Sequence, residues 1–257
     1  MLENTSFTFN GIDSESMGVI MISSGSGLYQ DIFLPNRSIV ETATPNKNIR
    51  YLKRVEKESL SFPFSIYIQN WQEWNNLRSI IRWLDQDEYC EFWVNDDPER
   101  IFYVMVEGSS ELMHNGLKEG YATMTLRSLY PFALSPTYME SLNIEGTDEI
   151  ILNNDGDATI RPYLTITKIG DGDISILNEG NNQEFILTDL YDGEVIEVDC
   201  TNEEIKSSLE EVTNRFLFDN HNDVWLDLEE QTDSRLIFTG DFTIDITYQL
   251  VYKNELT

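Results

Sequence analysis

Basic residues and histidine are scarce in this sequence, and their scarcity excludes several classes of function. The 257 residues include 17 Lys and Arg against 46 Asp and Glu, a formal net charge of −29 at pH 7. A chain of this charge repels duplex DNA, because DNA is itself a polyanion and contact would release few counterions. With only His114 and His221, no multi-histidine metal site can form, and neither residue lies in a GxSxG motif. We predict no specific nucleic-acid binding and no enzymatic activity.

Cysteines and long apolar runs are also few. Cys90 and Cys200 lie in apolar or alternating runs, which predicts two buried free thiols. No stretch approaches the ~18 apolar residues of a membrane span, so no membrane insertion is expected. The start, MLENTSFTFNG, lacks a basic segment followed by an apolar one, so we expect synthesis in the cytoplasm without a cleaved signal.

Cofactor motifs are missing as well. The sequence has neither a GxxxxGK[ST] loop nor a GxGxxG after a strand, and no cofactor is predicted. Two DGD clusters, Asp155–Asp157 and Asp171–Asp173, could offer carboxylates to calcium, but neither has the spacing of an EF-hand loop. Hairpin turns are the preferred interpretation, and His114 and His221 are likewise interpreted as surface turn residues.

What the sequence does contain predicts two domains, 1–136 and 137–257, joined at the segment from Pro131 to Pro136. The hydrophobic fraction of 40% is large enough for a core in each. Up to Pro136 there are 11 basic and 18 acidic residues, and after it 6 and 28, so the composition changes at this point. Because proline fixes its own backbone angle, we expect the joint to be a stiff elbow.

The first domain is predicted to contain strands and one helix. FTFNGIDSESMGVIM indicates two short strands, and SLSFPFSIYI places alternate apolar residues on one face, with Pro63 implying an edge or a bulge. The helix is expected after Asn70 and Glu73, which have capping-box spacing, with Trp74, Leu77, Ile81 and Leu84 at helical intervals. YCEFWV and RIFYVMVE indicate a hairpin, and YATMTLRSLY indicates a further strand.

The second domain is predicted to be a β-sandwich or jelly roll, because short apolar runs recur between Asn, Asp and Gly. These runs are EIIL, IRPYLTIT, DISIL, EFILT, EVIEVDC, RFLF, DVWLDL, RLIF and DFTIDITYQLVY. Between Thr201 and Val212, a capping-box spacing favours one or two helical turns. The predicted fold class is mainly β, with an α+β first part.

Two groups of residues are candidates for a functional site. The irregular stretch from Gly25 to Arg54 predicts a long loop or an extended arm, on or beside which lie five basic residues: Lys47, Arg50, Lys53, Arg54 and Lys57. In so acidic a protein, this cluster would suit contact with an acidic face of a second copy in a ring. Tyr191 and Trp225 are candidates for stacking on saccharide rings, although aromatic residues in strands belong more often to a core.

Taken in order, these segments resemble the distal tail protein family (Dit) of long-tailed, non-contractile bacteriophages. The resemblance rests on FTFNGIDSESMGV, LSFPFSIYI before a Trp-rich helix, YCEFWVNDDPERIFYVMVEG, YPFALSP, NNDGDATIRPYLTI, GEVIEVDC and FTGDFTIDITYQLVY. It implies a ring-forming N-terminal domain with a helix and an arm, then a galectin-like sandwich. The segment NKNIRY stands where many relatives have a glycine-rich turn.

The same resemblance implies a place in the virion. It implies a homohexamer in the baseplate that joins the tail tube protein to the tail-associated tip protein and carries receptor-binding proteins. Acidic side chains lining such a ring would let DNA pass without adhesion. The alternative function is a carbohydrate-binding adhesin that attaches the virion to cell-wall saccharide.

Overall fold

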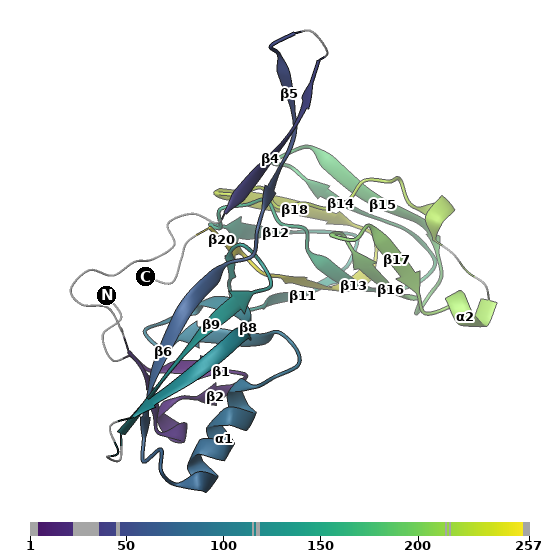
Figure 1. Cartoon of the computed structure of the whole chain (residues 1–257). Coiled ribbons are helices and arrows are strands. Elements are labelled where there is room, and N and C mark those ends of the chain that lie inside the picture. Colours follow the sequence, from purple (N-terminus) through teal and green to yellow (C-terminus); the bar gives the residue numbers. More distant parts are fainter. Residues whose placement is uncertain are drawn as a thin grey trace. The chain divides into compact units, whose positions relative to one another are not determined.

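The computed structural model describes residues 5–22, 36–44, 47–114, 116, 119–213, 215 and 217–253. Its chain divides into two compact units (Figure 1). Unit 1 comprises the residues up to Leu134 and those from Tyr252 onward, and unit 2 is Ser135–Val251. Unit 2 therefore begins at Ser135, one residue before Pro136, and the chain returns to unit 1 at Tyr252.

Unit 1 is built on an antiparallel sheet. The strand order is β2-β1-β7-β8-β9-β6-β3, with β10 paired to β8. The bounds are β1 Phe7–Phe9, β2 Ile12–Asp13, β3 Val19–Met21, β6 Ser61–Gln69, β7 Cys90–Val94, β8 Asp97–His114, β9 Glu119–Ser128 and β10 Ala133–Leu134, with a 3₁₀ turn η1 at Glu15–Met17. The strands expected in this part of the chain are confirmed.

Proline 63 shows how the sheet accommodates a residue without a backbone N–H. Strand β6 pairs with β9 along its whole length, including Pro63 with Thr125, whereas β3 pairs with β6 only from Ile66 to Ile68. At Pro63 the strand therefore has one neighbour, and no ladder hydrogen bond is lost on the other side. The sequence expectation of an edge position holds locally.

Aromatic rings dominate the core of unit 1. Phe7 lies 5.1 Å from Phe64 in an edge-to-face arrangement, and it stacks on Trp83 at 5.6 Å between ring centroids. The buried Trp83 donates its Nε1–H to the Phe9 carbonyl at 2.8 Å. This bond ties helix α1 (Trp74–Leu84) to the first strand.

Helix α1 begins at a later residue than the sequence predicts, and it buries a different face. Asn70 adopts a left-handed backbone (φ 53°), Glu73 makes no side-chain cap, and the helix starts at Trp74, so the capping-box prediction was wrong. Ile80, Trp83 and Leu84 are buried, whereas Trp74 and Ile81 are 73% and 53% exposed. The packed face is therefore rotated away from the predicted one.

Unit 2 is a two-sheet β-sandwich, as the sequence predicted. One sheet has the order β11-β19-β13-β16-β17 and the other β12-β18-β14-β15. The bounds are β11 Tyr138–Ile144, β12 Thr147–Asn154, β13 Tyr163–Lys168, β14 Gly172–Asn178, β15 Gln183–Leu190, β16 Val195–Asp199, β17 Glu204–Ser207, β18 Thr232–Thr239 and β19 Phe242–Tyr248. Alternation along the strands explains the core; in β19, Phe242, Ile244 and Ile246 are buried.

Several expectations for unit 2 were wrong. Of the run RFLF, the described residues Arg215, Leu217 and Phe218 are in no strand: Leu217 is buried and Phe218 starts a 3₁₀ turn η2 (Phe218–Asn220). DVWLDL forms only an isolated bridge between Leu228 and Ile160. Where helical turns were expected from Thr201, β17 pairs with β16, and the helix α2 spans only Glu210–Thr213. Pairing with a sheet edge outweighed the local capping pattern.

Neither DGD cluster lies in the turn of a hairpin. Asp155–Asp157 lies in the connection from β12 to β13, which belong to different sheets, and Asp171 ends the connection from β13 back to β14, whose first residues are Gly172 and Asp173. The side chains of Asp171 and Asp173 accept hydrogen bonds from the backbone N–H groups of Asp192 and Asp189, both at 2.9 Å. These carboxylates thus fasten the connection to the loop and strand beside it.

Candidate assembly and binding sites

The predicted arm is a β-hairpin, here called the arm hairpin. Its strands are β4 (Arg37–Ala43) and β5 (Arg50–Lys57), and they pair only with each other, as the narrow ribbon in Figure 1 shows. The expectation of a loop is corrected for these residues, while positions 25–35, 45 and 46 of the predicted arm lie outside the described residues. Since a lone two-stranded hairpin is marginal in water, the arm hairpin is a candidate for contact with another surface.

One face of the arm hairpin carries three exposed apolar side chains among charged ones, which the sequence reading missed. Ile39 pairs with Val55, and Leu52 follows on the same face opposite Glu41. All three side chains are exposed, by 45% to 64%. The alternation from Ile39 and the bulge beside Val40 are visible only once the two strands are paired, because the bulge shifts which residues of β5 share a face.

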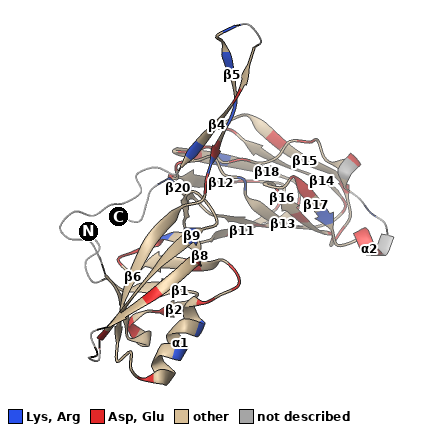
Figure 2. Cartoon of the chain, in the orientation of Figure 1, with Lys and Arg blue, Asp and Glu red and all other residues tan. Residues whose placement is uncertain are grey.

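The five predicted basic residues all lie on or beside this hairpin. Arg50 pairs with Glu41 at 3.2 Å and Arg54 with Glu56 at 2.5 Å, so part of the positive charge is neutralised within the arm. Lys47, Lys53 and Lys57 have no carboxylate of a described residue within ion-pair distance. In Figure 2 these positions appear as blue segments on a largely tan hairpin.

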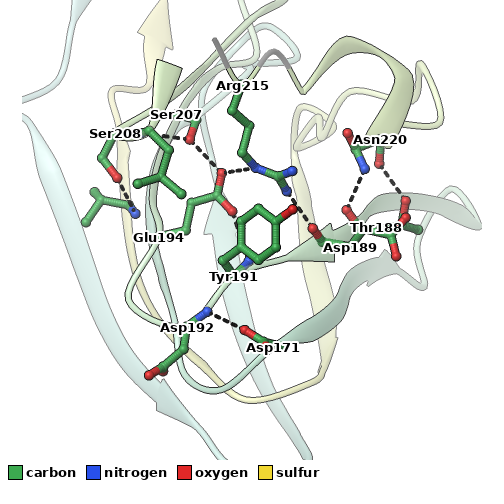
Figure 3. A network of polar contacts seen from close by, with 12 residues as sticks. Asp171, Thr188, Asp189, Tyr191, Asp192, Glu194, Ser207, Ser208, Arg215 and Asn220 are labelled. Carbon is green, nitrogen blue, oxygen red and sulfur yellow. Dashed lines mark hydrogen bonds and ion pairs between the residues drawn. The ribbon is translucent and has the colours of Figure 1, made fainter. Parts of the chain in front are cut away.

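Tyr191 is 52% exposed, and one face of its ring is covered by a neighbouring side chain. The guanidinium carbon of Arg215 lies 4.3 Å from the centroid of the Tyr191 ring, a cation–π contact that covers one face (Figure 3). Arg215 also donates from Nε to Glu194 at 2.7 Å and from a terminal nitrogen to the Asp189 carbonyl at 2.5 Å. No sequence pattern indicates this network, because Arg215 is 21 residues from Glu194 along the chain.

Glu194 is the buried centre of that network. Its carboxylate accepts hydrogen bonds from Arg215, from the Ser207 hydroxyl at 2.5 Å and from the Tyr191 backbone N–H at 3.0 Å. Burial by itself raises the pKa of Glu194, but the bonds from Arg215 and Ser207 outweigh it and hold the pKa below the ordinary value. The network fastens Arg215 to the loop before β16.

Trp225 lines an open cleft of about 650 Å³ in unit 2. The other lining residues are Arg161, Asn182, Gln183, Glu184, Glu203, Asp223, Val224 and Asp227. The ring of His221 lies 4.6 Å from that of Trp225 and 4.9 Å from that of Phe185. The two candidate aromatic residues are therefore in different surroundings, and only Trp225 lines this cleft.

His114 is exposed, as the surface interpretation predicts, whereas His221 is partly buried, which that interpretation did not foresee. The ring of His114, at the end of β8, stacks on Trp71 at 4.0 Å. His221 is partly buried, and this burial lowers its pKa even though the Val224 carbonyl lies 3.1 Å from Nε2. Each ring therefore packs against a neighbouring aromatic side chain.

The cysteines are free and buried, as predicted. Burial raises the pKa of Cys90, and it raises the pKa of Cys200 to about 12. Both thiols are therefore protonated near neutral pH and unsuited to nucleophilic attack.

The described part of the chain contains no cluster of metal-binding side chains and no helix suited to crossing a membrane. Within it, no three His, Cys, Asp or Glu side chains are close enough together to hold a metal ion. None of its helices is long and apolar enough to cross a bilayer.

Two family models match the chain one after the other. Residues 2–128 match the N-terminal domain of a phage tail protein family, and residues 132–248 match a phage tail C-terminal domain. The chain belongs to this phage tail protein family. Across 97% of its length the tail protein is 28% identical to YomH, an SPβ prophage-derived protein of Bacillus subtilis (strain 168), and the match covers 98% of YomH.

A solved structure shares the fold of this tail protein. It is similar to the Dit protein of phage SPP1, with a TM-score of 0.63 over 95% of this chain and 98% of that one, at 12% identity. The resemblance to distal tail proteins is thereby confirmed, and so is the mainly β fold class. SPP1 Dit is described as a paradigm of the hub of adsorption apparatus in phages infecting Gram-positive bacteria.

Proposed function

We propose that this tail protein is the distal tail hub of a long-tailed phage baseplate, where it forms a homohexameric ring. The observation that carries the proposal is the arm hairpin, whose exposed apolar side chains and whose lysines without an ion pair belong to a ribbon with no sheet neighbour among the described residues. The likeness to SPP1 Dit supports the assignment. Residues 1–136 would build the ring, and residues 137–257 would form a galectin-like sandwich.

The arm hairpin has the chemistry of a contact between copies. Copies that touch head to tail through two different patches form a ring when the rotation from one copy to the next divides a full turn evenly. Ile39, Leu52 and Val55 would supply apolar area, and Lys53 and Lys57 would face carboxylates on a neighbouring copy. With 46 acidic residues, every copy offers such carboxylates.

The hub would join two other tail components. In this role the ring connects the tail tube protein to the tail-associated tip protein and supports receptor-binding proteins. The protein would be synthesised in the host cytoplasm and would be part of the virion tail. No chemistry is required of any residue, and DNA would pass through the ring without binding, repelled by its net charge of −29.

The ring is tested by measuring the molar mass of purified protein with light scattering coupled to gel filtration. We expect a hexamer for the natural chain and smaller species for the double variant Leu52→Ser with Val55→Ser, and for Lys53→Glu with Arg54→Glu and Lys57→Glu. Ile151→Ser is the matched control, because Ile151 is a comparably exposed (62%) apolar strand residue in unit 2. A natural chain that remains monomeric at high concentration, or arm variants that assemble normally, would contradict the proposal.

A further inference from the structure

The cleft beside Trp225 presents hydrogen-bonding groups that the fold itself does not use. The side chains of Asn182, Gln183, Glu184 and Asp223 have no hydrogen bond or ion pair to another described residue. Two amides and two carboxylates thus face an open cavity with free donors and acceptors. Such groups match the hydroxyls of a polyol, which both donate and accept.

One wall of the cleft is aromatic and held in place. Trp225 is partly buried, and His221 packs between it and Phe185. The His221 ring is fixed in turn through the Val224 carbonyl. Because the Trp225 ring is already held in place, a ligand that binds against it orders no side chain there and loses little conformational entropy. The flat ring suits a ligand with a flat apolar face.

The charge around the cleft limits the ligand further. Four carboxylates line it, from Glu184, Glu203, Asp223 and Asp227, against the single guanidinium of Arg161. Arg161 is already paired with Glu203 at 2.8 Å, and it reaches the Cys200 carbonyl at 3.4 Å. No cation of the lining is left to receive a phosphate, sulfate or carboxylate, and the surplus carboxylates repel an anion.

We infer that the Trp225 cleft is a binding site for a saccharide that carries no negative charge. One pyranose ring lies against Trp225, and its hydroxyls reach the side chains of Asn182 and Asp223. A cavity of about 650 Å³ is within the range of small-ligand sites. The inference goes beyond the hub and does not depend on ring formation, since all the lining residues belong to unit 2.

The test is calorimetric titration of the full chain with defined oligosaccharides. The neutral N-acetylglucosamine tetramer and its positively charged, de-acetylated form are the probes, and a glycerol-phosphate oligomer is the anionic comparison. We expect at least one of the first two to bind and the anionic oligomer not to bind. Trp225→Ala should weaken binding on the order of tenfold or more, as the loss of a central aromatic anchor does.

One control variant and two variants of the cleft test the inference further. Tyr191→Ala removes an aromatic residue outside the cleft and should leave the affinity unchanged. Asn182→Gly and Asp223→Asn alter exposed residues with left-handed backbones (φ 55° and 57°), which Gly and Asn tolerate, and each should weaken binding severalfold. Failure of both probes to bind, equal binding by the Trp225→Ala variant, or stronger binding of the anionic oligomer would overturn the inference. Light scattering on the same samples reports separately on the ring.

Discussion

Among the described residues, only one ion pair is largely withdrawn from water. The side chain of Glu194 has no exposed surface and that of Arg215 is 12% exposed, whereas the other pairs lie at the surface. Removing one partner of such a pair leaves a charge buried without compensation. We expect Arg215→Ala to lower the free energy of unfolding by about 3–5 kcal/mol, measured by urea denaturation.

Arg235 is the control for this prediction. It forms two ion pairs, with Glu149 and with Glu179, but its side chain is 46% exposed. Because water and salt screen such pairs, Arg235→Ala should cost less than about 1 kcal/mol. Equal losses in the two variants would show that the Arg215 pair is not the buried anchor described above.

The same carboxylate predicts a pH dependence. Because the folded pKa of Glu194 lies below its ordinary value of 4.5, the unfolded chain takes up the proton first as the pH falls. The stability from this group is present in full above about pH 4.5 and is lost as the pH falls through the folded pKa. Urea denaturation at several pH values should therefore show a large difference between the natural chain and Glu194→Gln at pH 7, which shrinks in acid. A difference that grows in acid would have the wrong sign.

At the scale of elements, helix α1 contains two tryptophans in opposite environments. Trp83 is buried and its Nε1–H satisfies the Phe9 carbonyl, whereas Trp74 is 73% exposed. Trp83→Phe leaves that carbonyl unpaired and should cost about 1–3 kcal/mol. Trp74→Phe should change stability by less than about 0.5 kcal/mol. Chemical denaturation of both variants measures the contrast, and a larger effect at Trp74 would mean that its exposed face packs against something in solution.

Strands were more predictable than the helix face or the arm. In β6 and β19, period-two alternation alone identifies the buried side chains, because a strand in an antiparallel sheet has only two faces. In α1, Trp74 and Ile81 fit the helical period as well as Ile80 and Trp83 do, so spacing cannot tell which face meets the sheet. That choice depends on the position of Phe7 and Phe9 in the folded unit.

The candidate sites were predictable only in part, for a similar reason. The run of Lys and Arg identified the arm, but its apolar face depends on the bulge beside Val40. Trp225 was named from its residue type, whereas its cleft gathers residues from four separate stretches of the sequence. Tyr191 was named on the same grounds, and the contact with Arg215 distinguishes it.

At the scale of the whole molecule, the charge opposes compact folding. A net charge of −29 repels itself across the surface, and salt screens this repulsion over about 10 Å at 0.1 M ionic strength. Raising potassium chloride from about 10 to about 150 mM should therefore raise the melting temperature by roughly 2–4 °C, which corresponds to about 1 kcal/mol for a chain of this size. Scanning calorimetry measures the shift, and a lower melting temperature would indicate that attractive pairs dominate.

The return of the chain to unit 1 has a consequence for the order of folding during synthesis. Tyr252 packs against the core of unit 1 but follows the whole of Ser135–Val251 in the sequence. At ~5–20 residues per second, translation of that intervening stretch takes on the order of ten seconds. Unit 2 has all of its residues before unit 1 does, so the domain begun first is completed last. A chain that ends at Val251 and is released from the ribosome would hold every residue of the sandwich, whereas its N-terminal core would still lack the Tyr252 side chain.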